Sequence, residues 1–380
     1  MIARLAAALT LPLLASTTLQ AAPATLQAAP ATAHAAPATA QAASATAQAA
    51  SATAQAAPAT PLLAPVIAHA RPVTARAESP AARAARADVS LPGSGGVTYR
   101  EQAGDPVRLT AYGLGTRAAY LRAPSGAAFT RNAALSEVSV SPDGRLAAGV
   151  PKAYRDGVDA LVLTDRATGR SVRVRTVRKP LTASYASWSR DGRRVALTVQ
   201  SRTGGAWRAV GFTVVDVRTG AARTVGVPGL PPKAGFWWSP GGSLAASYGG
   251  GVRFYRASDG AVVRTLRGVG RPTGPEDPFS PSGTRLATWC PPPSGRQAAG
   301  EQLCVVDVAS GTVARRMAPR PEAVFGWWDE THLVGVARQG NGYRLAVLDL
   351  AGRATRALAD VPRPAWDADL WVSFTRARAR

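Results

Sequence analysis

Very few residues of this 380-residue chain could perform catalysis. A serine hydrolase needs a nucleophile, a histidine base and an acid that orients the base, yet His332 is the only histidine after residue 69. The segment from Gly241 to Ala245 lacks the last glycine of a nucleophile elbow. Two cysteines and one histidine at scattered positions do not make a zinc site, and no phosphate-binding or dinucleotide-binding glycine motif is present. The sequence therefore predicts a chain that is not an enzyme and that uses no cofactor and no metal.

Four charged residues are candidates for ligand binding. Arg271, Glu276 and Asp277 lie in the Pro- and Gly-rich segment 268–278, and Glu137 precedes a serine turn at an equivalent place. Such a segment can hold a ligand, or it can be an ordinary connection between strands. Both interpretations stay open at the level of sequence.

Cys290 and Cys304 are predicted to form a disulfide. Cys290 ends the apolar run TRLATWC, and Cys304 lies near the start of the next run, LCVVDV. Consecutive runs of this kind form antiparallel neighbours, and oxidation is expected if the protein is exported. Two buried free thiols are the alternative.

The elements that would position these residues are short strands separated by a recurring turn. Six turns follow an apolar or aromatic residue at intervals of about 40 to 50 residues, the period of a propeller repeat. In them proline presets φ, aspartate caps the turn, and glycine takes the positive φ. The turns begin at Val140 (VSPDG), Trp188 (WSRDG), Trp238 (WSPGG), Phe279 (FSPSG), Trp328 (WDETH) and Trp366 (WDAD).

A second series of turns interleaves with the first and marks a second set of hairpins. Its glycines are Gly126, Gly169, Gly220, Gly260, Gly311 and Gly352. Two hairpins per repeat are typical of a four-stranded propeller blade. The sequence therefore predicts an all-β fold, a six-bladed β-propeller of four-stranded antiparallel blades. We expect C-terminal strands over 365–375 to close the ring, as the two inner strands of the blade that residues 107–131 begin.

The repeats resemble a known family. W-S-P-D-G, an apolar strand and then V-D-x-x-T-G is similar to the WD40-like (PD40) repeat of TolB-type propellers, best over residues 140–150, 188–199 and 212–225. The resemblance implies a secreted binding protein, with segment 268–278 leading toward the central channel where propellers commonly bind ligands. Similar blades also form the gating domain of prolyl oligopeptidase-like enzymes.

Two pairs of tryptophans could also serve binding. Trp237–Trp238 and Trp327–Trp328 each precede a turn, where an aromatic platform could hold a glycan. Neighbouring blades are expected to cover these positions, which favours packing between blades.

The first 96 residues have a different composition. Phe, Tyr and Trp are absent before Tyr99, and Ala, Thr, Pro and Gln dominate. Such a segment cannot bury enough apolar surface to fold. Residues 22–96 are therefore predicted to be a disordered, low-complexity linker built on a heptad repeat, and residues 97–380 the propeller.

The N-terminus itself predicts export from a bacterial cell. Arg4 precedes an apolar run from Leu5 to Ala15, and small residues follow. This is typical of a signal peptide within residues 1–35, and we expect cleavage between residues 21 and 35. An uncleaved anchor is the alternative. The propeller region contains no apolar stretch long enough for a transmembrane helix.

The chain is strongly basic, with a formal net charge of +22. Only three of its 45 basic residues are lysine, a bias typical of a GC-rich genome. Arg173, Arg175 and Arg178 are expected on an outer strand, either as a stripe for polyanions or as charges that protect the strand edge. The charge should draw the protein to anionic surfaces.

Together these observations predict an exported, non-catalytic propeller, a monomer, that binds a protein or a cell-envelope polymer. It would be secreted or associated with the envelope. An accessory or remnant of a propeller-containing enzyme, of the prolyl oligopeptidase or lyase kind, is the first alternative. A basic surface for polyanions, with nucleic acid less favoured than wall polymer or anionic lipid, is the second.

Overall fold

The computed structural model describes residues 86–291, 301–318 and 320–377. The predicted signal peptide, its cleavage window and the linker up to residue 85 lie outside the described residues. None of the helices in the described ranges is long and apolar enough to cross a membrane.

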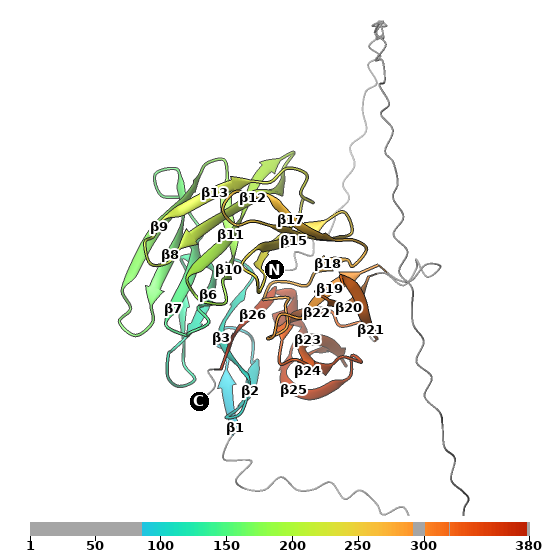
Figure 1. Cartoon of the computed structure of the whole chain (residues 1–380). Helices are drawn as coiled ribbons and strands as arrows, with labels where there is room; N and C mark the ends of the chain where they lie inside the picture. The colour runs from blue at the N-terminus through green and yellow to red at the C-terminus, as the bar shows by residue number, and fades with distance from the viewer. Residues whose placement is uncertain (1–85, 292–300, 319, 378–380) are drawn as a thin grey trace, which may run out of the picture. The chain divides into compact units, whose positions relative to one another are not determined.

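Six sheets of four antiparallel strands form the blades of a propeller, which confirms the predicted fold (Figure 1). Blade 2 contains β6 (Leu135–Val140), β7 (Leu146–Pro151), β8 (Val158–Asp165) and β9 (Ser171–Arg178). Blade 3 contains β10 (Thr182–Trp188), β11 (Arg194–Thr203), β12 (Ala206–Asp216) and β13 (Ala222–Gly226). Blade 4 contains β14 (Phe236–Trp238), β15 (Leu244–Tyr248), β16 (Gly251–Tyr255) and β17 (Val262–Leu266). Blade 5 contains β18 (Arg271–Pro272), β19 (Arg285–Cys290), β20 (Gln302–Asp307) and β21 (Thr312–Met317). Blade 6 contains β22 (Ala323–Trp327), β23 (His332–Gln339), β24 (Gly342–Asp349) and β25 (Ala354–Val361).

Blade 1 joins the two ends of the propeller. The C-terminal strand β26 (Leu370–Arg376) pairs with β3 (Val107–Leu114), and β4 (Ala119–Arg122) and β5 (Phe129–Asn132) complete the sheet. Figure 1 shows β26 beside β3. Closure by the C-terminus is therefore confirmed, but the expectation that residues 365–375 supply two strands is wrong. One strand, and not two, comes from the C-terminus.

The reason is a short helix where the sequence suggested a sixth turn. The segment WDAD falls in and after α2 (Arg363–Asp367), which has a proline in its first turn, a position that suits helix initiation. Trp366 stacks on Tyr343 of blade 6, with ring centroids 4.7 Å apart. The segment thus packs against blade 6 as a connection, and only β26 remains to close the ring.

A hairpin before the ring extends the fold upstream of residue 97. Strands β1 (Arg86–Ser90) and β2 (Thr98–Gln102) pair in antiparallel fashion. Val89 and Leu91 are buried in the same apolar cluster as residues of blades 1 and 6. The folded unit therefore starts no later than Arg86.

The ends of the strands define two faces of the ring. The turn face carries the serine turns and the glycine turns. The loop face carries the connections between second and third strands and those from blade to blade. On the turn face Ser141 donates to Asp143 (Oγ–Oδ1 2.5 Å), and Gly144 has φ 73°, as the sequence predicted for this turn.

Candidate ligand site along the propeller axis

Contacts between blades that are not neighbours locate the axis of the ring. Arg190 of blade 3 donates to Asp277 of blade 5, with Nη2 and Oδ2 3.1 Å apart. Ser373 of blade 1 hydrogen-bonds to Glu276 of blade 5. Blades 3 and 5 are separated by blade 4, and blades 5 and 1 by blade 6. Because such pairs can meet only near the axis, these side chains line the central channel.

Glu276 is a half-buried carboxyl on the channel wall. Its nearest charged neighbour in the sequence is Asp277, and no cation forms a salt bridge with it among the described residues. Protein around the side chain takes the place of bulk water, which raises the pKa of Glu276 to about 8, although the hydrogen bond with Ser373 acts in the opposite direction. The carboxyl is thus held in a place that disfavours its negative charge.

Asp277 forms the centre of a cluster with two arginines. Its Oδ1 accepts the backbone N–H of Phe279 at 2.9 Å, and Arg190 forms the salt bridge given above. Burial still raises the pKa of Asp277, against the effects of Arg190 and Arg376. Arg376 donates to the carbonyl oxygen of Trp327 at 3.4 Å. The cluster lies toward the turn face, since Arg190 also donates to the carbonyl of Ser280, the first residue of a serine turn, at 2.7 Å.

Glu137 is a second carboxyl without a salt-bridge partner among the described residues. Its Oε1 accepts the backbone N–H of Ala186 at 3.2 Å. Burial raises the pKa of Glu137 to about 7. The pKa of Tyr185, next to Ala186, is also raised, first by burial and then by the charge of Glu137.

These residues occupy one level of the ring. Glu137, Tyr185 and Glu276 each precede the first serine of their turn by four residues. The innermost strands of four blades are irregular near this level, with register shifts in β6, β10, β22 and β26. A bulge leaves a residue unpaired and redirects its side chain, and Tyr185 has a positive φ of 59°. This part of the channel wall is therefore formed by innermost strands whose pairing is irregular.

The arrangement fits a ligand with a cationic group. Two carboxyls lack a cation, while Asp277 is already paired with Arg190. A positive group close to either carboxyl would favour the ionisation of that carboxyl. The described residues contain no group of three or more side chains suited to a metal ion.

Arg271 does not join the other three predicted site residues. It begins blade 5 near the loop face, where its guanidinium binds Glu301 with Nη2 and Oε2 2.7 Å apart. The side chain is half exposed. Segment 268–278 thus contains β18, the innermost strand of its blade, with Arg271 near the loop face and Asp277 in the cluster toward the turn face.

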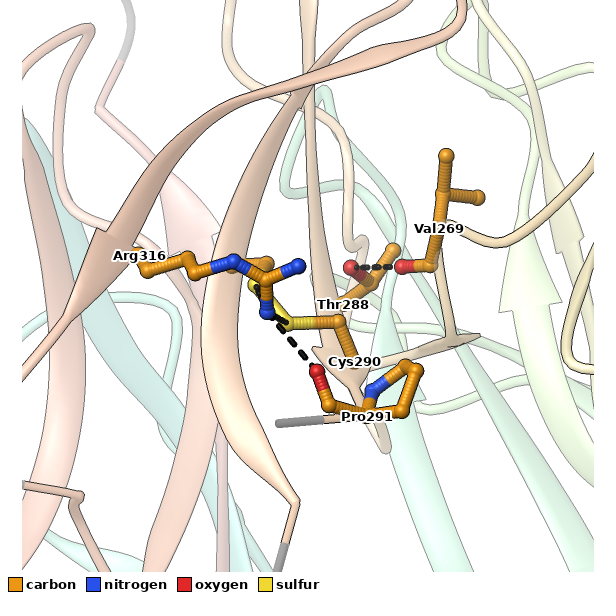
Figure 2. Close-up of a disulfide and its surroundings, with 6 residues drawn as sticks. Val269, Thr288, Cys290, Pro291 and Arg316 are labelled. Atoms are coloured by element: carbon orange, nitrogen blue, oxygen red, sulfur yellow. Dashed lines mark hydrogen bonds between the residues drawn. A yellow bond between two sulfur atoms is a disulfide. The ribbon is translucent and has the colours of Figure 1, made fainter. Parts of the chain in front are cut away.

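Cys290 and Cys304 form a disulfide between strands β19 and β20, with Cα atoms 5.9 Å apart (Figure 2). Thr288 pairs with Cys304 across these strands, so the two cysteines are diagonal neighbours on one face. Arg316 lies beside the sulfur atoms and donates to the carbonyl of Pro291 at 2.7 Å. The disulfide joins the two middle strands of blade 5 and is separate from the cluster around Asp277.

The remaining candidates have structural partners. The ring Nδ1 of His332 lies 3.0 Å from the carboxylate of Asp329 within the same turn. Trp238, Trp327 and Trp328 are buried, which confirms their predicted packing role. Trp237 is half-buried and directs its Nε1 toward the carbonyl of Pro275 at 3.4 Å.

Sequence reasoning missed four residues of the channel: Arg190, Arg376, Tyr185 and Ser373. Two of them left a signal. Arg190 stands where three other serine turns have proline, at Pro142, Pro240 and Pro281. Tyr185 stands four residues before the serine of its turn, as Glu137 and Glu276 do. Ser373 and Arg376 lie in β26, which has no turn motif of its own.

Comparison with solved structures finds propellers of low identity. TolB from Acinetobacter baumannii is 18% identical, with 68% of each chain covered and a TM-score of 0.45. A putative TolB from Agrobacterium tumefaciens is 16% identical, covering 72% of this chain and 99% of that one, with a TM-score of 0.42. The β-propeller domain of a trilobed protease from Pyrococcus furiosus is 11% identical, covering 69% of this chain and 74% of that one, with a TM-score of 0.46. These similarities concern the fold alone.

No protein-family model matches the sequence, and no curated protein matches it either.

Proposed function

We propose that this chain is an exported, non-catalytic binding module, and that its central channel holds a cationic group of a protein or of a cell-envelope polymer. One observation carries the proposal. Glu276 lines the channel, Glu137 lies on the innermost strand of blade 2, and both have raised pKa values and lack a salt-bridge partner among the described residues. Carboxyls left in this state destabilise the free protein once they ionise, and a cationic ligand would remove that cost.

Export is supported by two independent features. The N-terminal residues have the charge and apolar run of a signal peptide. The disulfide between Cys290 and Cys304 suits an oxidising compartment. N-terminal sequencing of the secreted protein should give a start within or just after residues 21–35, and an intact Met1 there would contradict export by cleavage.

The binding test uses the full chain, immobilised and exposed to solubilised envelope from the producing cells. We expect a component to be retained at about 0.15 M salt, where exposed charges more than about 8 Å apart are largely screened. The double variant E137Q/E276Q should lose most of this retention because it cannot pair with a cationic group. R271A is the matched control, since Arg271 is charged and on the same blade as Glu276 but lies away from the cluster.

Equal retention by wild type and E137Q/E276Q would overturn the channel as the site. Because R271A changes the net charge in the opposite direction, an equal loss in R271A would indicate damage to the fold and not the loss of a cation site. Reproducible turnover of a peptide or glycan library by the purified chain would overturn the non-catalytic assignment.

A further inference from the structure

Acidic and basic residues separate between the two faces of blades 3 and 4. In these two blades, from residue 182 to residue 266, the acidic residues are Asp191, Asp216 and Asp259. All three lie in turns on the turn face, where each carboxylate accepts a backbone N–H of its own turn. This use of aspartate in turns leaves the loop face of the same two blades without an acidic residue.

The loop face of blades 3 and 4, together with the adjoining end of β9, carries six exposed cations. None of them has a salt-bridge partner among the described residues. They are Arg178 at the end of β9, Lys179 before β10, Arg202 and Arg208 in the β11–β12 hairpin, Lys233 before β14, and Arg267 after β17. Asp156 and Asp159 of blade 2 lie at the edge of this group, where Asp159 accepts hydrogen bonds from Thr182 and Ala183. Because the cations outnumber these carboxylates, the face has a positive potential that attracts anionic partners.

A hairpin projects from this face. Strand β12 pairs with β13 only over Gly211–Val215, and β10 pairs with β11 only as far as Gln200. The segment from Ser201 to Arg208 therefore has no neighbouring strand on either edge. Its length is peculiar to blade 3, whose β11 and β12 have 10 and 11 residues against at most 8 in any other strand of the described blades.

Trp207 lies near the tip of this hairpin. It is 44% exposed, and it is the only tryptophan of the chain with an exposed side chain. Arg202 is its direct partner across the hairpin, and Arg208 follows it in sequence. At the foot of the hairpin an open depression of about 410 Å³ is lined by Ala209, Val210 and residues 226–230.

We propose that the loop face of blades 3 and 4 is a docking surface for an anionic phospholipid membrane, with Trp207 at the lipid interface between Arg202 and Arg208. Tryptophan favours the boundary between headgroups and acyl chains, and basic residues gain from the negative surface of anionic lipids. A membrane fits better than an acidic peptide because the cations are spread over several loops and line no groove. The proposal is separate from the channel, so the two can fail independently.

The test is sedimentation of the full chain with vesicles of phosphatidylcholine, with and without about one third phosphatidylglycerol, at near-physiological salt. We expect binding only to the anionic vesicles. The variant R202E/R208E should bind at least tenfold more weakly, since each basic residue near such a surface contributes roughly fivefold in affinity. W207A should weaken binding several-fold without changing the net charge.

R173E/R175E is the matched control, because these exposed arginines lie within β9 and away from the hairpin. It removes the same charge and should retain most of the binding, and circular dichroism should give the same spectrum for all variants. Failure of the wild type to bind anionic vesicles would overturn the proposal, as would equal losses in R202E/R208E and R173E/R175E. Binding to polyglutamate but not to vesicles would overturn it in favour of an acidic polymer.

Discussion

At the scale of single residues, the carboxyls of the channel wall lower the stability of the fold. Glu276 accepts a hydrogen bond from Ser373 but has no cation, while Arg190 engages Asp277 one position further along. A fold selected for stability alone would place apolar side chains at such positions. Binding of a cationic group, as proposed above, would explain why these carboxyls have no salt-bridge partner among the described residues.

This cost predicts how stability depends on pH. In the unfolded chain Glu276 has an ordinary pKa of about 4.3, whereas in the folded chain it is about 8. Between these values the unfolded chain has released the proton and the folded chain retains it, so rising pH favours unfolding. We expect the free energy of unfolding to fall from about pH 5 to about pH 8, and E276Q to reduce that fall by about 1 kcal/mol or more.

Urea denaturation at several pH values measures this effect. E301Q is the control, since Glu301 pairs with Arg271 at an exposed position. If the free energy of unfolding falls equally with pH in wild type and E276Q, Glu276 is not the group whose raised pKa causes the fall.

At the scale of elements, the sequence predicted those turns whose conformation is determined by their own residues. The turns after Val140, Trp188, Trp238 and Phe279 were recognisable because Gly144, Gly192, Gly242 and Gly283 must adopt a positive φ. The segment at Trp366 has neither Pro nor Gly in that place, and its structure is set by packing against Tyr343. Periodicity could therefore count the blades but could not assign the last strand.

That last strand gives the second prediction. A chain ending at Asp369 lacks β26, which leaves β3 paired with β4 alone and removes Trp371 and Val372 from the apolar cluster of blades 1 and 6. We expect this truncation to abolish the cooperative thermal transition, because an open ring exposes strand edges and core. A chain ending at Ala377 keeps β26 and serves as the control. Cooperative melting of the shorter chain near the full-length temperature would contradict ring closure by β26.

At the scale of the whole molecule, ring closure brings the candidate site together. Arg190 and Asp277 are 87 residues apart in sequence and meet at the axis, whereas Arg271 and Glu276 are five residues apart in sequence and have different partners, Glu301 and Ser373. The separation of two residues in the sequence therefore does not show whether they meet in the fold. Glu137 and Glu276 could be predicted because the repeat places them at equivalent positions, and Arg376 could not because it follows no repeat motif.

The same ring determines where the folded unit must begin. Val89 and Leu91 are 0% and 3% exposed, and β1 pairs with β2 along its whole length. A chain starting at Val97 loses both side chains from the core and leaves β2 without its partner. Burial of each such side chain contributes about 1.5–3 kcal/mol, so we expect the chain starting at Val97 to be about 3 kcal/mol or more less stable than one starting at Arg86. Urea denaturation of both chains, with the full-length protein as reference, measures the difference. Equal midpoints and slopes for the two starts would mean that the hairpin of β1 and β2 is not part of the cooperative unit.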